Sequence, residues 1–134
     1  MKKINAPAQS LVEFAIIAPL LIVMLLGTVD FALAFGNQMA IRSAVAEGGY
    51  FIAQHPGNQA GAERQVRELL RDLPGATETG RLNVSFVSTG CVSGRQDTTV
   101  AVSYRHDFWF TAVLPAAQVL LQSETTVPQF GSCS

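Results

Sequence analysis

The stretch QSLVEFAIIAPLLIVMLLGTVDFALAFG, residues 9–36, decides how this chain is organised. No residue between Phe14 and Val29 is charged, and the apolar character resumes after Asp30. A helix rises about 1.5 Å per residue, so about 20 such residues match the ~30 Å hydrocarbon layer of a bilayer. Because the stretch is apolar on every side rather than along one stripe, it predicts a membrane-spanning helix. The alternative, a buried core helix, needs more surrounding protein than the rest of the chain offers.

Length and composition fit one anchor and one small folded domain. The chain has 134 residues, a net charge of −1 and 14% charged residues, a deficit that reflects the apolar stretch. We therefore expect a short leader (residues 1–8), a membrane helix (9–36) and a head domain (37–134). The nearly neutral charge gives no basic field of the kind that nucleic-acid binding needs.

The residues before the apolar stretch predict its orientation. Lys2 and Lys3 precede it without any acidic residue, and lysines beside a membrane helix favour the cytoplasmic side. The head is then expected on the other side of the membrane. A secretory signal peptide is the alternative interpretation, but this apolar segment is longer than a signal-peptide core and no small-x-small site closes it. The small pair Pro7-Ala8 lies before the apolar stretch instead.

Glu13 is costly at the entrance of a membrane helix unless it is neutralised. One explanation is the helix dipole, which favours an acid in the first turn. Another follows from spacing: cleavage between Ala8 and Gln9 would make Glu13 the fifth residue of the mature chain. A new α-amino group, mostly cationic at neutral pH, could then pair with Glu13 of a neighbouring subunit.

Two other residues of the apolar stretch carry expectations. Pro19 removes one helical hydrogen bond, so a kink or a melted turn is expected near residues 15–19. Asp30 lies 17 residues after Glu13, roughly 25 Å along a helix, which places it near the opposite face of the membrane. We expect a solvated interfacial carboxylate there, with pairing during assembly as the alternative.

The motif Ala8-Gln9-Ser10-Leu11-Val12-Glu13-Phe14-Ala15, followed by Ala18-Pro19-Leu20-Leu21, resembles the N-terminal signature of TadE-like minor pseudopilins. These belong to the tight-adherence (Tad, or Flp) branch of type IV pili. The resemblance continues through residues 27–31 and weakens over residues 44–49. It implies cleavage by a prepilin peptidase between Ala8 and Gln9, although the family usually has glycine where this chain has Ala8. It also implies assembly roles for Glu13, Phe14, Pro19 and Asp30.

The resemblance implies a structural function, as a minor subunit that initiates, primes or caps a Tad pilus. The implied location is the bacterial inner membrane, single-pass with a periplasmic head, or the pilus itself. The implied partners are other pilin or pseudopilin subunits, the prepilin peptidase, the inner-membrane assembly platform and the lipid bilayer. The first alternative is a permanent inner-membrane anchor whose head is a scaffold or ligand-binding module, and the second is an envelope enzyme.

The head reads as an α+β fold. Residues 37–53 are amphipathic and continue the first helix, with Gly48-Gly49 marking a bend or a close packing point. Asn58 can cap a second helix through Asp72. Its expected buried stripe is Val66, Leu69, Leu70 and Leu73. Alternating residues predict strands at 81–88, 98–110 and 118–127, with a turn-rich link at 90–97. We expect an antiparallel three-stranded meander with the helices on one face.

The apolar segment at residues 108–115, FWFTAVLP, stands out at the end of the second predicted strand. We expect it to pack in the core. Contact with the membrane or with another subunit is the alternative.

The positions of the cysteines and histidines favour structural roles for these residues over catalytic ones. Cys91 and Cys133 are the only cysteines, and in an exported chain they predict a disulfide, with two free thiols as the alternative. No metal-ligand spacing and no cofactor motif appears in the sequence. Arg105-His106-Asp107 suggests an acid-base cluster, but neighbouring strand residues point to opposite faces. We therefore expect no enzyme activity, no cofactor and no metal.

Overall fold

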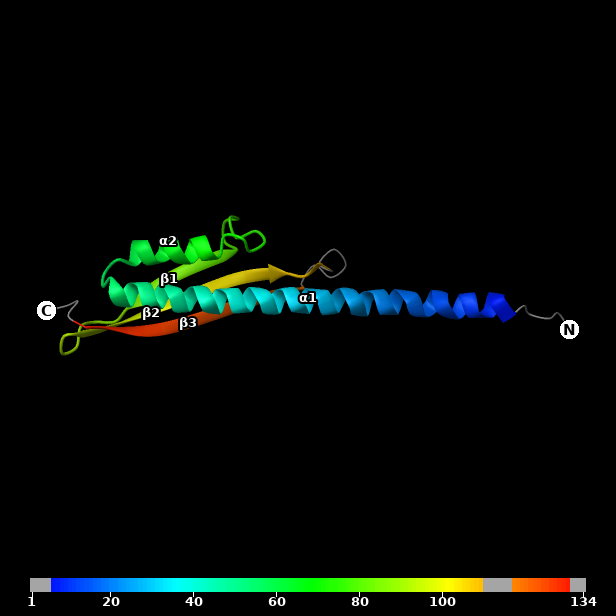
Figure 1. Ribbon diagram of the computed structural model, residues 1–134, viewed down its shortest axis with the longest axis horizontal. Helices are drawn as coiled ribbons and strands as arrows, with labels where there is room; N and C mark the ends of the chain where they lie inside the picture. Colours follow the sequence, from blue (N-terminus) through cyan, green and yellow to red (C-terminus); the bar gives the residue numbers. More distant parts are fainter. Residues whose placement is uncertain (1–5, 110–116, 131–134) are drawn as a thin grey trace. The chain divides into compact units, whose positions relative to one another are not determined.

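The computed structural model describes residues 6–109 and 117–130. Its elements, in chain order, are α1 (Ala6–Gln54), α2 (Gln59–Leu69), β1 (Leu82–Ser88), β2 (Arg95–Asp107) and β3 (Gln118–Phe130) (Figure 1). The predicted α+β class, with a long N-terminal helix, a second helix and a three-stranded antiparallel sheet, is confirmed. The chain divides into two compact units, one up to Leu33 and one from Ala34 onward. We call the second unit the head.

Helix α1 is a single α-helix of 49 residues that contains Pro19. Of the two expectations near residues 15–19, the melted turn is therefore wrong, and the kink stays a prediction. Proline lacks only its own N–H, so it removes one bond of the helical ladder, to the carbonyl of Ala15. The long apolar helix on both sides keeps its remaining bonds, and one missing bond does not interrupt it.

Helix α2 begins where the sequence predicts and ends earlier. Asn58 caps it, because the backbone N–H of Gly61 donates to Asn58 Oδ1 at 3.0 Å. The helix stops at Leu69 rather than at Asp72, and turns follow. Leu69 is 53% exposed, so its predicted place in the buried stripe is wrong, and Ala62 takes part instead. The stripe Ala62, Val66 and Leu70 keeps the four-residue spacing of one helix face.

The three strands form the predicted antiparallel meander, in the order β1-β2-β3. β2 begins at Arg95, inside the segment predicted as a link. Ser93 (φ 53°) and Gly94 (φ 73°) form a two-residue turn, and Val92 and Arg95 exchange backbone hydrogen bonds of 2.9 and 3.0 Å across it. Positive φ at both central residues suits the twist of a tight hairpin, which lets the strand start directly after the turn.

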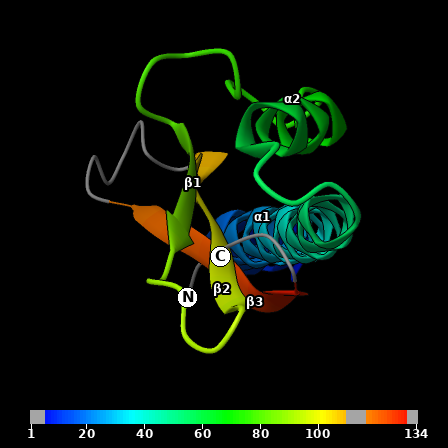
Figure 2. The same ribbon diagram turned by 90° about the vertical axis from the view of Figure 1, so that its left-hand side faces the viewer.

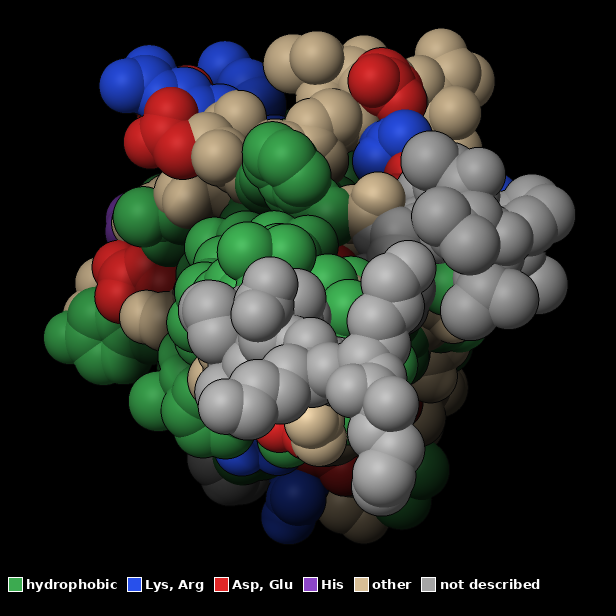
Figure 3. All heavy atoms as spheres, turned by 90° about the vertical axis from the view of Figure 1, so that its right-hand side faces the viewer, with side chains coloured by type: hydrophobic (Ala, Val, Ile, Leu, Met, Phe, Trp, Pro, Cys, Tyr) green, Lys and Arg blue, Asp and Glu red, His purple; other side chains and the backbone are tan. Residues whose placement is uncertain are grey.

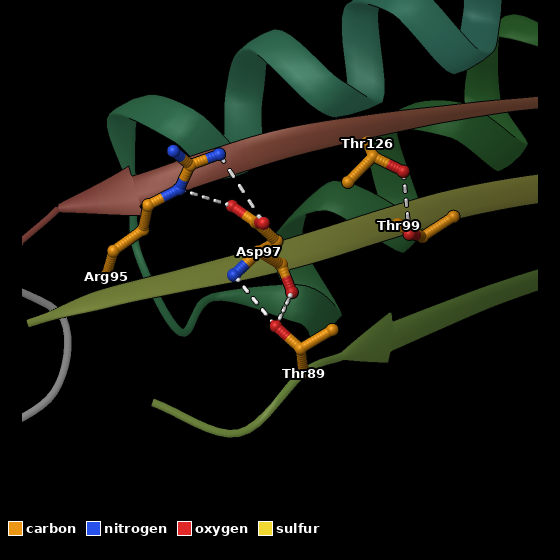
Figure 4. A network of polar contacts seen from close by, with 5 residues as sticks. All are labelled: Thr89, Arg95, Asp97, Thr99 and Thr126. Atoms are coloured by element: carbon orange, nitrogen blue, oxygen red, sulfur yellow. Dashed lines mark hydrogen bonds and ion pairs between the residues drawn. The ribbon is translucent and has the colours of Figure 1, made fainter. Parts of the chain in front are cut away.

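A polar network stabilises the end of the sheet next to the Ser93-Gly94 turn (Figure 4). Thr89 Oγ1 donates to the carbonyl oxygen of Asp97 and accepts from the Asp97 N–H, both at 3.1 Å. Arg95 Nε lies 2.9 Å from Asp97 Oδ1. The hydroxyls of Thr99 and Thr126 lie 2.8 Å apart between β2 and β3. The network holds Thr89 against β2 one residue after β1 ends.

β3 runs to Phe130, three residues beyond the predicted end. The predicted strand ended at Val127, before Pro128, which lacks a ladder donor. β3 is an edge strand of this sheet, and an edge strand tolerates proline.

The helices lie on one face of the sheet (Figure 2), and the core fills the space between these two layers. The second half of α1, helix α2 and strands β1 and β2 all contribute. The buried core residues are Ile41, Ala44, Val45, Ile52, Ala62, Val66, Leu70, Leu73, Leu82, Val84, Val100, Val102 and Tyr104. Side-chain amides join α1 to β3: Gln38 Nε2 donates to the Gln122 carbonyl at 3.0 Å, and Gln129 Nε2 to the Ile52 carbonyl at 3.4 Å.

Gly48 and Gly49 allow α1 to approach its neighbours closely. A Cβ on Gly48 would lie 2.5 Å from Val66 Cγ2, and one on Gly49 would lie 2.8 Å from Thr125 Cγ2. Both distances are far below ordinary van der Waals contact. Of the two predicted roles, the structure therefore supports the close packing point: Gly48 faces α2 and Gly49 faces β3.

Tyr104 secures the turns that follow α2. Its ring is 1% exposed and its hydroxyl donates to the carbonyl of Pro74 at 2.6 Å. Burial raises the pKa of the Tyr104 hydroxyl above its ordinary value, and the nearby Arg81 partly opposes this shift. The hydroxyl therefore remains a neutral donor at physiological pH.

Candidate functional site

The apolar half of α1 is exposed on all sides. Its large apolar side chains from Leu11 to Val29 are about half or more exposed, and hydrophobic side chains gather around the helix when it is viewed from its N-terminal end (Figure 3). The helix is long and apolar enough to cross a membrane, and none of its most apolar window is buried within the protein. Such a surface is stable in lipid or against other apolar helices, and costly in water.

Glu13 lies on this exposed helix, one turn after Gln9. Gln9 Nε2 donates to Glu13 Oε1 at 3.4 Å, a long bond that only partly satisfies the carboxylate. The neighbouring Phe14 is exposed, as is Pro19 one and a half turns later. The bond between Ala8 and Gln9 lies in the first turn of α1, where helices fray. Cleavage at Ala8–Gln9 and the assembly roles of these residues stay predictions.

Asp30 differs from its expected environment. It is 2% exposed, so the prediction of a solvated carboxylate is wrong. Asp30 precedes Ala34 by four residues and Ile41 by eleven, which puts all three on one face of α1. That face is buried at all three positions. The covered face of α1 therefore begins at Asp30, about 30 Å along the helix from Gln9. The predicted assembly role of Asp30 stays a prediction.

The face of the sheet opposite the helices is open. It bears a shallow depression of about 480 Å³, lined by Ser85, Ala101, Val102, Ser103, Gln122, Ser123 and Glu124. The lining is dominated by small and hydroxyl-bearing residues, and it contains one carboxylate. If the head binds a ligand, this depression is the candidate binding site among the described residues.

The segment Arg105-His106-Asp107 divides between the two faces, as the strand pattern predicts. His106 is buried on the helix side, where Asn37 Nδ2 donates to its Nδ1 at 3.1 Å. Arg105 is exposed on the open face. Asp107 Oδ2 instead binds Arg81 Nη2, at 2.7 Å. The three side chains are therefore not assembled into one acid-base site.

Cys91 lies in the link between β1 and β2, two residues before the tight turn. It is exposed and does not carry a free thiol. Cys133 lies outside the described residues, so the disulfide between the two stays a prediction.

Trp109 lies in the apolar segment 108–115 that the sequence singled out. It was expected in the core, yet it is 79% exposed, the highest value among the large hydrophobic residues described. Core packing is therefore wrong for Trp109, because β2 ends at Asp107 and no longer directs the following side chains. Phe110 and the rest of the apolar segment through Pro115 lie outside the described residues.

Comparison with known protein families finds a match within α1. The family model described as TadE-like protein matches residues 8–49, which span most of α1. No curated protein and no solved structure matches the chain. The match covers Glu13, Phe14, Pro19, Asp30 and the Gly48-Gly49 pair. Residues 8–49 of this chain are therefore a TadE-like segment, which confirms the resemblance predicted from the sequence.

Proposed function

We propose that this chain, associated with the Tad pilus through its TadE-like segment, is a structural minor pseudopilin. As such a subunit, the chain would take part in initiating, priming or capping the pilus. The observation that carries the proposal is that residues 8–49, the TadE-like match, include a helix half that is apolar and exposed on every side. In this proposal the N-terminus is cytoplasmic, α1 crosses the inner membrane, and the head is periplasmic.

The energetics of α1 support exchange between lipid and a helical assembly. Lipid chains are as apolar as leucine, so helices associate in a membrane through packing and polar contacts rather than through the hydrophobic effect. The apolar half of α1 can therefore leave lipid only where other pilin or pseudopilin helices replace the lipid around it. Pilin-type subunits are thus the proposed partners, together with a prepilin peptidase and an inner-membrane assembly platform.

Glu13 is the group that would make this exchange specific. In the described chain its carboxylate has one weak donor, Gln9 Nε2. Cleavage after Ala8 would turn Gln9 into the mature N-terminus and create an α-amino group four residues from Glu13. In an assembly, the amino group of one subunit would neutralise Glu13 of the next and fix the stagger between their helices.

Substituting Glu13→Ala tests the proposal. Breaking a buried ion pair costs about 3 to 5 kcal/mol, so we expect a loss of assembled pili of about 100-fold or more. Membrane insertion should be unchanged or improved, because a charge is removed from the apolar helix. Pili sheared from cells and the membrane fraction are compared by quantitative immunoblotting.

The matched control is Glu47→Ala, on the exposed face of the same helix within the head. Glu47 accepts a hydrogen bond from Gln65 Nε2 at 3.1 Å and belongs to no apolar surface. This variant should assemble normally. Wild-type piliation by Glu13→Ala, with the protein inserted, would contradict the proposed role.

The alternative function is a permanent membrane anchor with a scaffold or ligand-binding head. The open depression on the sheet is the observation that favours it. In that case α1 stays in lipid, no cleavage after Ala8 is needed, and Glu13→Ala leaves the function of the head intact.

A further inference from the structure

Trp109 is the only tryptophan of the chain, and it stands exposed at one end of the sheet. It follows the last residue of β2 by two positions, and the adjacent Phe108 N–H donates to the Ala117 carbonyl at 3.2 Å. This bond ties the start of the β2–β3 connection across to the start of β3. The backbone next to Trp109 is therefore held at the end of the sheet.

The same end of the sheet lies beside the point where α1 enters the head. His106, three residues before Trp109, accepts the hydrogen bond from Asn37. The head begins at Ala34, directly after the apolar part of α1. Along the chain, this end of the head is therefore the one next to the membrane-spanning segment.

Helix length gives the depth of this end in a bilayer. From Gln9 to Gly36 the helix extends about 40 Å at 1.5 Å per residue. A bilayer with both headgroup layers is also about 40 to 45 Å thick, of which ~30 Å is hydrocarbon. With Gln9 at the outer edge of one headgroup layer, the hydrocarbon ends about 36 Å along the helix, near Leu33, and Asn37, at about 42 Å, lies in the far headgroup layer.

Other exposed side chains at this end suit a headgroup layer. Phe35 is 69% exposed and precedes Asn37 by two residues. Leu120 is 56% exposed and is the register partner of Arg105, whose exposed guanidinium can bind a lipid phosphate. Tryptophan is enriched at membrane interfaces, because its ring buries apolar area while its N–H remains hydrogen-bonded.

We infer that the Trp109 end of the head rests in the headgroup layer of the bilayer, with Trp109 as an interfacial anchor that holds the head on the membrane before assembly. The inference rests on the proposed membrane anchoring of α1. Leaving the membrane for a filament would then require withdrawing Trp109 from the headgroups as well as α1 from the hydrocarbon.

The single tryptophan makes a direct test possible. The full chain is placed in phosphatidylcholine–phosphatidylglycerol nanodiscs whose acyl chains carry bromine either near the headgroup or near the chain end. Trp109 should emit at a shorter wavelength than tryptophan in water. It should lose most of its fluorescence to the bromine near the headgroup and little to the bromine near the chain end.

Two variants serve as controls in a Trp109→Phe background. Leu21→Trp places the probe in the apolar half of α1, and Tyr50→Trp places it on the exposed face of α1 within the head. The first should be quenched most by the deeper bromine, and the second by neither. Quenching of the Leu21→Trp probe without quenching of Trp109 would overturn the inference and leave the membrane anchor standing.

Two other results also decide the question. If neither Trp109 nor the Leu21→Trp probe is quenched, α1 is not in the bilayer, and both the inference and the proposed anchoring fail. A short emission wavelength of Trp109 without bromine quenching would mean that protein, such as a second copy of the chain, covers it. That result would overturn the inference as well.

Discussion

Replacing Cys91 with serine is expected to lower the free energy of unfolding of the head by about 4 kcal/mol in an oxidising environment. The predicted disulfide with Cys133 closes a loop of about 40 residues, and the lost loop-closure entropy of the unfolded chain gives this magnitude. A small domain has only about 5 to 15 kcal/mol of stability in total. The measurement is urea unfolding of the purified full chain in a mild detergent, with and without a reducing agent.

The pairing itself is tested by comparing variants. If Cys91 and Cys133 are joined, then Cys91→Ser, Cys133→Ser and the double variant should all lose the same stability, and a reducing agent should affect only the wild type. Additive losses from the two single variants, or a wild type insensitive to reduction, would contradict the disulfide.

Replacing Gly48 with valine is expected to destabilise the head by about 3 kcal/mol. An added Cβ would already lie 2.5 Å from Val66 Cγ2, and further methyl groups would overfill a closely packed core. The gain in helix propensity over glycine recovers only a few tenths of a kcal/mol. Thermal unfolding monitored by circular dichroism measures the loss.

Gly36 provides the matched control for this substitution. It lies in the same helix, and a Cβ there would meet no atom within 4 Å. Gly36→Val should therefore be almost neutral. Adding Val66→Ala to Gly48→Val should restore part of the lost stability by making room for the new side chain. Equal stability of Gly48→Val and Gly36→Val would show that α1 and α2 do not approach as closely as described.

The elements that depend on local physics were predictable from the sequence. The length and uniform apolarity of residues 9–36 predict the exposed half of α1, and no other part of the chain is needed for that conclusion. Asn58 predicts the start of α2 through a contact with Gly61 only three residues away. The alternation of Val100, Val102 and Tyr104 predicts which side of β2 is buried.

Errors arose where distant parts of the chain decide the outcome. Leu69 and Leu70 were both expected to be buried, but only Leu70 keeps the four-residue spacing of Ala62 and Val66, and Leu69 is exposed. The early start of β2 was signalled by Ser93-Gly94, a dipeptide typical of tight turns, but it was interpreted as a longer link. The burial of Asp30 is not revealed by the periodicity of the apolar stretch.

The candidate site was predictable in part. Glu13 and the exposed apolar helix follow from composition and spacing, and the TadE-like match supports them. The exposure of Trp109 did not follow, because an apolar segment at a strand end fits the core, a membrane or a partner equally well. The exposure of Trp109 argues against the core, and the position of the β2 end beside Asn37 is the observation from which the membrane interface is inferred.

Determining the N-terminal residue of the protein purified from membranes of cells that assemble the pilus tests the central claim most directly. If α1 is an assembly helix that enters the pilin pathway, the mature chain begins at Gln9, which leaves Glu13 as its fifth residue. A membrane-bound chain that keeps Lys2 and Lys3 would contradict this claim and favour a permanent anchor.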